Sequence, residues 1–221
     1  MHIEVASCLE GARRAKGLTV IIDVFRAGNT IISCFANGAG HVVPVGNLER
    51  AYELKREFPD YFLAGERKSY PPEGFDFGNS PSEADEIDFE GRGVILTTSS
   101  GTQGIVNAKN ADEILLGTYA NASRIIDYIQ SSDPEWVTLV PMGFESSVKA
   151  EEDEAYALYL KQRLEGKPVD FLKQKQQLLQ SEGAERLRRI GKERDLEWCL
   201  MLDKYAVLPI YARTEEKLVK I

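Results

Sequence analysis

The first two thirds of the chain alternate short apolar runs with amphipathic segments. The apolar, β-branched run at residues 18–23 is typical of a strand buried on both faces. Similar runs predict strands at residues 1–5, 41–45, 61–64, 93–97, 114–116 and 137–140. Between them, residues 31–36 and 48–58 are predicted to be helical. This alternation predicts an α/β fold with α/β/α layers around a mostly parallel, mixed sheet.

The last third of the chain has a different pattern. From about residue 151 onward it is charged and mostly helical, with breaks near residues 166–168 and at Gly183. Residues 205–211 contain Pro209, which has no N–H to donate, so they predict an edge strand. Neither an internal repeat nor a linker divides the chain. We therefore predict a single domain over residues 1–221, with two closely packed lobes as the alternative.

Polar clusters follow several of the predicted strands. Asp23 ends the first buried strand, Glu66 follows residues 61–64, and a run of hydroxyl side chains begins at Thr97. In open α/β sheets the ligand lies beyond the carboxyl ends of the strands. These clusters therefore predict one site, built from loops at the strand ends.

Two of the clusters pair an acid with a base. A carboxylate such as Asp23 can bind a hard cation, and Arg26 can bind an oxyanion with two hydrogen bonds. Glu66 and Arg67 repeat this pattern. Helix capping by Asp23 and a surface ion pair at Glu66 are the structural alternatives.

The hydroxyl-rich run at residues 97–102 contains Gly101 and precedes a predicted helix. Backbone N–H groups and short hydroxyl side chains in such a turn can hold a phosphate or sulfonate group. The alternative is ordinary helix capping. The acidic run at residues 151–154 is explained by the helix dipole alone, or it supplies a magnesium ligand or a general base.

Composition narrows the class of protein. The net charge of −8 is opposite to that of a typical nucleic-acid binder. No apolar run approaches the length needed to cross a bilayer, and residues 1–5 do not resemble a signal peptide. Three widely spaced cysteines, Cys8, Cys34 and Cys199, favour a reducing, cytoplasmic location over a disulfide framework.

Other phosphatase chemistries fit less well. Residues 8–14 match the CxxGxxR spacing of cysteine phosphatases, but only three residues separate them from the next strand, which leaves no room for the helix that should follow. Phe25 stands where an aspartyl-phosphate phosphatase needs a second Asp. With only His2 and His41, a histidine nucleophile or a multi-histidine zinc site is not expected.

Four ordered stretches together resemble the 2-phosphosulfolactate phosphatase (ComB) family. They are Ile22-Asp23-Val24-Phe25-Arg26-Ala27 with Thr30, Gly65-Glu66-Arg67, Glu73-Gly74-Phe75-Asp76-Phe77-Gly78-Asn79-Ser80-Pro81, and Thr97-Thr98-Ser99-Ser100-Gly101-Thr102. The match continues through Glu152-Asp153 and from Asp195 to Pro209. It covers residues 18–211 in order, and the third stretch is the most specific.

The resemblance implies magnesium-dependent hydrolysis of 2-phosphosulfolactate to sulfolactate and phosphate, on the route to coenzyme M. It implies that Asp23, Glu66 and Asp153 ligate the metal or activate water. The substrate-binding residues that it implies are Arg26, Thr30, Arg67, Asn79, Ser80, Thr97, Thr98, Gly101 and Thr102. The partner is then a small anionic phosphate ester, and a homodimer stays open.

Two alternatives remain, and the first follows from departures of the chain from the family pattern in its anion loops. Gly28-Asn29-Thr30 stand where the family usually has a Thr-Ser-Thr-like run, and Lys68-Ser69-Tyr70 replace its glycines. A phosphatase of the same fold with another small phosphate ester is therefore one alternative. The other is a non-catalytic anion-binding protein, although such a protein has little use for clustered carboxylates.

Overall fold

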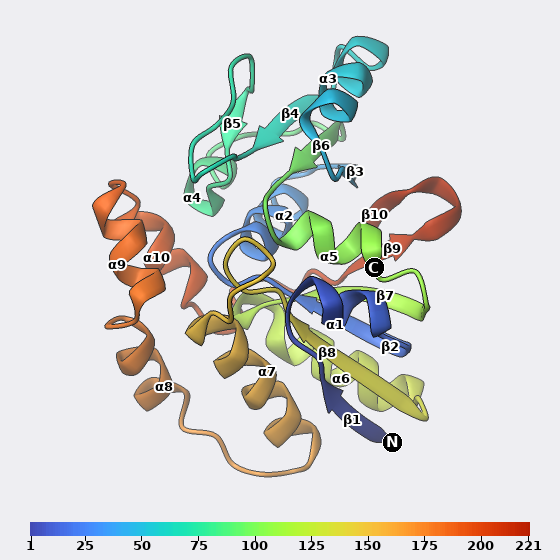
Figure 1. The fold of residues 1–221 in the computed structure, drawn as a ribbon, viewed down its shortest axis with the longest axis vertical. Coiled ribbons are helices and arrows are strands. Elements are labelled where there is room, and N and C mark those ends of the chain that lie inside the picture. Colours follow the sequence, from blue (N-terminus) through green and yellow to red (C-terminus); the bar gives the residue numbers. More distant parts are fainter.

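A computed structural model describes residues 1–221 (Figure 1). Its ten strands form one sheet in the order β1-β8-β2-β7-β9-β10-β3-β6-β4-β5. The strands are β1 (His2–Val5), β2 (Gly17–Ile22), β3 (His41–Pro44), β4 (Phe62–Gly65), β5 (Phe77–Gly78), β6 (Gly93–Thr97), β7 (Ala111–Gly117), β8 (Trp136–Pro141), β9 (Pro209–Ala212) and β10 (Lys217–Lys220). The predicted mixed α/β sheet is thereby confirmed.

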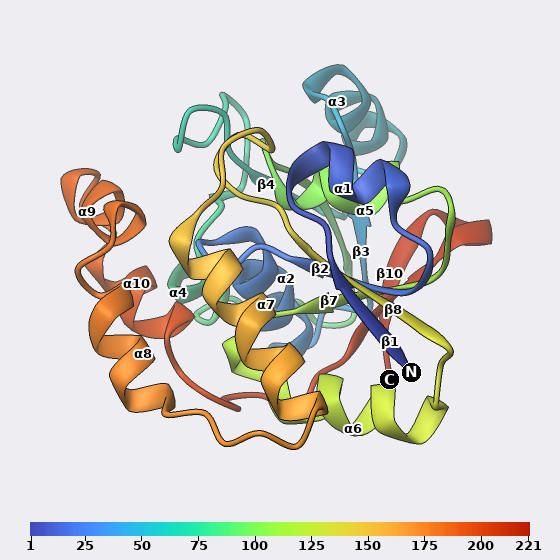
Figure 2. The ribbon, with the colours of Figure 1, turned by 60° about the horizontal axis from the view of Figure 1, so that its bottom comes forward.

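Helices connect the strands and cover the sheet. They are α1 (Cys8–Arg14), α2 (Ala27–Ala36), α3 (Leu48–Glu57), α4 (Pro81–Ala84), α5 (Gly101–Asn107), α6 (Ala122–Ser132), α7 (Glu151–Leu164), α8 (Phe171–Leu178), α9 (Glu182–Arg189) and α10 (Glu193–Cys199), with short 3₁₀ turns η1 (Tyr119–Asn121) and η2 (Arg213–Glu215). The charged C-terminal third is helical, as predicted, and forms α7 to α10 along one side of the molecule (Figure 2).

The side chains of β2 alternate between two hydrophobic cores. Leu18, Val20 and Ile22 join the core under α6, α7 and the C-terminal helices. Ile21 points to the opposite face and joins the core under α1, α2 and α5. Because successive side chains of a strand point to opposite faces, an apolar run without polar interruptions needs helices on both sides. The layered α/β/α arrangement follows from this pattern.

The sheet consists of two parallel groups that run in opposite senses. Strands β1, β8, β2 and β7 form one parallel group, and β3, β6, β4 and β5 form the other. The antiparallel hairpin β9–β10 lies between them and is paired with each group at a single position, Leu115 with Ile210 and Leu218 with Val42. These narrow junctions leave the two groups free to diverge by the ordinary twist of a sheet.

The hairpin corrects one prediction. Residues 205–211 were expected to form an edge strand, but β9 lies inside the sheet between β7 and β10. Pro209 is the first residue of β9, where a missing N–H interrupts the ladder least. The sheet edges are instead β1 and the two-residue strand β5.

Two further features bear on the class of protein. Residues 8–14, which match the cysteine-phosphatase spacing, form helix α1 themselves instead of a loop that leads into a helix. None of the helices has the length and apolar character that crossing a membrane requires. The single-domain prediction, with its two-lobe alternative, stays a prediction.

Candidate active site

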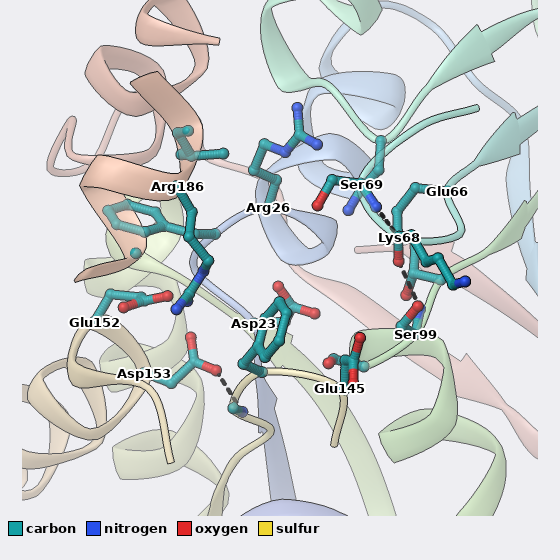
Figure 3. A pocket seen from close by; sticks show the side chains of 18 of the residues that line it. Asp23, Arg26, Glu66, Lys68, Ser69, Ser99, Glu145, Glu152, Asp153 and Arg186 are labelled. Carbon is teal, nitrogen blue, oxygen red and sulfur yellow. Dashed lines mark hydrogen bonds between the residues drawn. The ribbon is translucent and has the colours of Figure 1, made fainter. Parts of the chain in front are cut away.

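A polar pocket lies where the carboxyl ends of both strand groups meet α7 and α9 (Figure 3). Asp23 follows β2, Glu66 follows β4, Thr98 to Ser100 follow β6, and Gly143 follows β8. In a flat sheet the ends of oppositely directed strands would lie at opposite edges. Here the twist between the two groups brings them to one place, so that the polar clusters predicted separately share one pocket.

One wall of the pocket, the β2/α7 wall, consists of Asp23, Glu152 and Asp153. Asp23 is 5% exposed, and its Oδ1 accepts the N–H of Ala27 at 3.0 Å in the first turn of α2. Burial raises the pKa of Asp23 to about 6; the N–H groups of Ala27 and Gly101 oppose this shift, and the charge of Glu66 adds to it. Asp23 thus accepts an N–H group in the first turn of α2, and its carboxyl group titrates closer to neutral pH than an ordinary aspartate.

Only glycine fits at position 101, beside Asp23. A Cβ at this position would lie 2.9 Å from Asp23 Oδ2 and 2.9 Å from the Cβ of Ala27. The loop after β6 therefore approaches Asp23 as closely as its backbone allows. Gly101 was predicted to bind substrate, and in this structure it lies behind the pocket lining, against Asp23.

Asp153 joins the loops that follow β2 and β8. Its Oδ1 accepts the N–H of Val24 at 2.7 Å, and its Oδ2 accepts the N–H of Gly143 at 2.8 Å. Burial raises the pKa of Asp153 well above its usual range, and the charges of Asp23 and Glu152 add to this shift. The side chain fixes the geometry of the wall, and its ionised form is disfavoured by its surroundings.

Glu152 has a carboxylate oxygen that is buried without a hydrogen-bond partner. It is 3% exposed, and its buried Oε2 has no hydrogen-bond partner. The backbone of α9 closes over it, because a Cβ on Gly183 would lie 2.7 Å from Oε2. Burial raises the pKa of Glu152 to about 7, and the nearby Arg186 opposes this shift. Glu152 belongs to the matched Glu152-Asp153 pair, yet the prediction selected only Asp153.

The opposite wall, the β4/β6 wall, consists of Glu66, Lys68, Ser69, Thr98 and Ser99. Glu66 Oε1 accepts the N–H of Ser99 at 2.7 Å, and Oε2 accepts the N–H of Ser69 at 2.9 Å. The carboxylate therefore joins the loops after β4 and β6. Consequently, the N–H of Ser99, one of those expected to hold an anion, is already occupied.

The predicted site residues divide into two layers. Those that line the pocket are Asp23, Arg26, Glu66, Asn79, Thr98 and Asp153. Those that lie behind the lining are Thr30, Arg67, Ser80, Thr97, Gly101 and Thr102. The chemical role of each residue stays a prediction.

The second layer holds the first in place. Thr30 donates to Asn79 Oδ1 at 2.9 Å, and Thr98 N–H donates to Thr102 Oγ1 at 3.0 Å. The Arg67 guanidinium donates to the carbonyl of Glu66 at 2.6 Å and to Thr97 Oγ1 at 2.7 Å. Arg67 is therefore bound within the β4/β6 wall.

Two cationic side chains in the pocket were not predicted: Lys68 and Arg186. Arg186 comes from α9, and its guanidinium lies 4.4 Å from the centre of the Phe144 ring. Together with Arg26 they supply three positive charges for an anionic ligand. Arg186 carries no local sequence signal, because it is one of several arginines in a charged helical stretch.

The carboxylates fit a hard cation that is shared with a ligand. No three His, Cys, Asp or Glu side chains are grouped so that they could hold a metal ion by themselves. Magnesium, however, usually takes one or two carboxylates and completes its shell with water and phosphate oxygens. The unpartnered Glu152 Oε2 and the mutual repulsion of Asp23, Glu152 and Asp153 are features that such a cation would relieve.

The cysteine alternative finds no support at this site. Burial raises the pKa of the Cys8 thiol, and the charge of Glu154 raises it further. A nucleophilic cysteine needs the opposite shift. Cys8 is also absent from the pocket lining.

Comparison with known proteins agrees with the motifs. Residues 6–214 match the family model described as 2-phosphosulpholactate phosphatase. The chain is 32% identical to a protein of Caldanaerobacter subterraneus (86% of each chain covered) and 31% identical to one of Thermoplasma acidophilum (88% of this chain and 86% of the relative). Both relatives are named probable 2-phosphosulfolactate phosphatase. The chain therefore belongs to the 2-phosphosulpholactate phosphatase family of phosphoric monoester hydrolases.

Proposed function

We propose that this protein hydrolyses 2-phosphosulfolactate to sulfolactate and phosphate in a magnesium-dependent reaction. The observation that supports this proposal best is one pocket that combines the buried carboxylates Asp23, Glu152 and Asp153 with three cations, in a chain of this family. The substrate carries a phosphate, a sulfonate and a carboxylate. Arg26, Lys68 and Arg186 are the three cationic side chains in the pocket that these groups can contact.

Asp23 and Glu152 are the residues that we propose as metal ligands, and Asp153 holds them in position. Glu66, for which metal binding was predicted, has both oxygens engaged with backbone N–H groups, and we propose that its role is to shape the site. A bound Mg²⁺ would neutralise charge on the phosphate oxygens.

The reaction transfers the phosphoryl group to water. A water oxygen forms a bond to phosphorus, the ester P–O bond breaks, and the alcohol oxygen of sulfolactate leaves with a proton from solvent. A carboxylate oxygen of Asp23 would accept the proton of the attacking water. Arg26 and Lys68 stabilise charge on the phosphoryl oxygens, so that most of the catalysis comes from positioning and electrostatics.

The test is phosphate release from a panel of small phosphorylated acids that includes phosphosulfolactate and phospholactate, measured with magnesium and with EDTA. We expect release that requires magnesium and is fastest with phosphosulfolactate. Faster release from another ester would favour a same-fold phosphatase with a different substrate. A folded, magnesium-loaded protein that releases nothing would favour the anion-binding alternative.

A further inference from the structure

A buried carboxylate outside the pocket, Asp195 in the first turn of α10, is bound to a residue that lines it. Asp195 has no exposed surface, and it is not part of the pocket lining. Its Oδ2 accepts a hydrogen bond from Nη1 of Arg26 at 2.7 Å. Arg26 is itself only 4% exposed. The pair is therefore an ion pair in the interior, at the back of the site.

Every oxygen of Asp195 is engaged. Oδ1 accepts the hydroxyl of Ser80 at 2.7 Å, the hydroxyl of Ser82 at 2.6 Å and the N–H of Ser82 at 3.1 Å. With Arg26, this gives the carboxylate four donors. A buried charge with that many partners has one low-energy orientation, because any rotation would leave a donor without an acceptor.

The Arg26 guanidinium, in contrast, is engaged on one side only. Asp195 is the sole hydrogen-bond partner of its side chain in the structure. A guanidinium has five N–H donors, so the others remain available for an oxyanion. Arg26 also lies near enough to Asp23 that its charge lowers the pKa of that carboxyl group.

We infer that Asp195 is a positioning residue, which holds the Arg26 guanidinium in the orientation that binds the phosphoryl group. The inference rests on the proposed phosphatase activity. It also gives α10 a function: although 169 residues separate Asp195 from Arg26 in the sequence, this contact joins the C-terminal helices to the loop after β2. Ser80 then acts through Asp195 and does not contact the substrate.

The test is a double-mutant cycle read out by calorimetric titration of inorganic phosphate into the magnesium-loaded protein. Asp195→Asn keeps the shape but removes the charge that orients Arg26. We expect it to weaken phosphate binding about 30-fold, as Arg26→Gln should. In the Arg26→Gln background, Asp195→Asn should change binding by no more than about twofold, because the residue that it positions is already absent.

A matched control is available on the same part of the fold. Asp85, directly after α4, binds Asn37 at the end of α2 at 3.1 Å and, in the C-terminal segment, Lys204 at 3.2 Å and Tyr205. None of these partners lines the pocket. Asp85→Asn should therefore lower the melting temperature and leave the Kd for phosphate within about twofold of wild type.

Two results would overturn the inference alone: wild-type phosphate affinity in Asp195→Asn, or an equal loss in the presence and absence of the Arg26 side chain. If Asp195→Asn does not fold, Ser82→Ala removes one of the three donors to Oδ1 and should weaken phosphate binding about threefold. Unchanged affinity in that variant would count against the inference. A wild-type protein that binds no phosphate would overturn both this inference and the proposed function.

Discussion

On the β4/β6 wall, both carboxylate oxygens of Glu66 accept hydrogen bonds from backbone N–H groups. On the β2/α7 wall, in contrast, a buried carboxylate oxygen of Glu152 has no hydrogen-bond partner. Both side chains are carboxylates at the edge of the same pocket, and both are buried. Burial raises the pKa values of Asp23, Glu152 and Asp153. The charge of Asp23 raises those of Glu152 and Asp153 further, and Glu152 adds to the shift of Asp153. The first wall is a structural clamp, and the second holds charges that repel each other.

The difference shows how one pocket combines rigidity with reactivity. Buried carboxylates that repel one another lower stability, and such arrangements are found where a protein binds cations or moves protons. The loops that carry serines and Lys68 need the opposite property, a fixed shape, which Glu66 supplies. Substitutions on the two walls should therefore affect activity and stability in different proportions.

Asp23→Asn should have the largest effect on activity. It removes the proposed proton acceptor and metal ligand and preserves the side-chain shape, so we expect kcat to fall on the order of 10³-fold with an unchanged circular dichroism spectrum. Asp127→Asn, an exposed acid on α6, is the charge-matched control and should behave as wild type. Unchanged turnover in Asp23→Asn would exclude this residue from the mechanism.

Arg186→Gln should come next, because it removes one of three cations and leaves the carboxylates in place. We expect kcat/KM for phosphosulfolactate to fall about 30-fold, mainly through KM, as is usual for a lost charged hydrogen bond. Arg189→Gln provides the control: it lies on the same helix, is exposed, and pairs with Glu185 at 2.9 Å. Equal losses in the two variants would mean that the net positive charge of α9 matters, and not a specific contact between Arg186 and the substrate.

The sequence was sufficient for most of the scaffold and for the convergence of the loops after β2, β4 and β6 in one pocket. The β-branched run of β2 has no other stable solution than a strand buried on both faces, and the polar residues after β2, β4 and β6 do meet. It was not sufficient for β9, because Pro209 is compatible with an edge strand and with the first position of an inner strand.

The part of the pocket that α7 and α9 supply depends on contacts that local sequence patterns do not encode. Glu152 and Asp153 are neighbours in the first turn of one helix, and only the position of Gly183 and of the Val24 N–H distinguishes their surroundings. Arg186 reaches the pocket because α9 packs across the end of α7. Position along the sequence says nothing about that packing.

Glu66→Gln tests the clamp. An amide can accept only one of the two N–H hydrogen bonds and directs its own N–H₂ group at the other, so the loops should loosen. We expect a lower melting temperature and a fall in kcat/KM of about tenfold. Glu86→Gln, on an exposed side chain paired with Arg194, is the control. A loss as large as that of Asp23→Asn would show that Glu66 takes part in the chemistry and that the walls do not differ.

The smallest expected effect is on the pH dependence of stability in the metal-free protein. The pKa of Glu152 is raised from 4.5 to about 7 in the folded state, so its protonated form stabilises the fold below pH 4.5, and that contribution is lost as the pH rises through 7. Gln stays neutral, so Glu152→Gln should be more stable than wild type at pH 8 by on the order of 2 kcal/mol, or about 5 °C, and nearly equal to it at pH 5. Thermal melts in EDTA at the two pH values measure this, with the exposed Asp127→Asn on α6 as the control. Because Asp23 and Asp153 titrate in the same wall, the variant should reduce the pH dependence without abolishing it. A variant with the wild-type pH dependence would mean that Glu152 does not store the repulsion that distinguishes this wall from the clamp opposite.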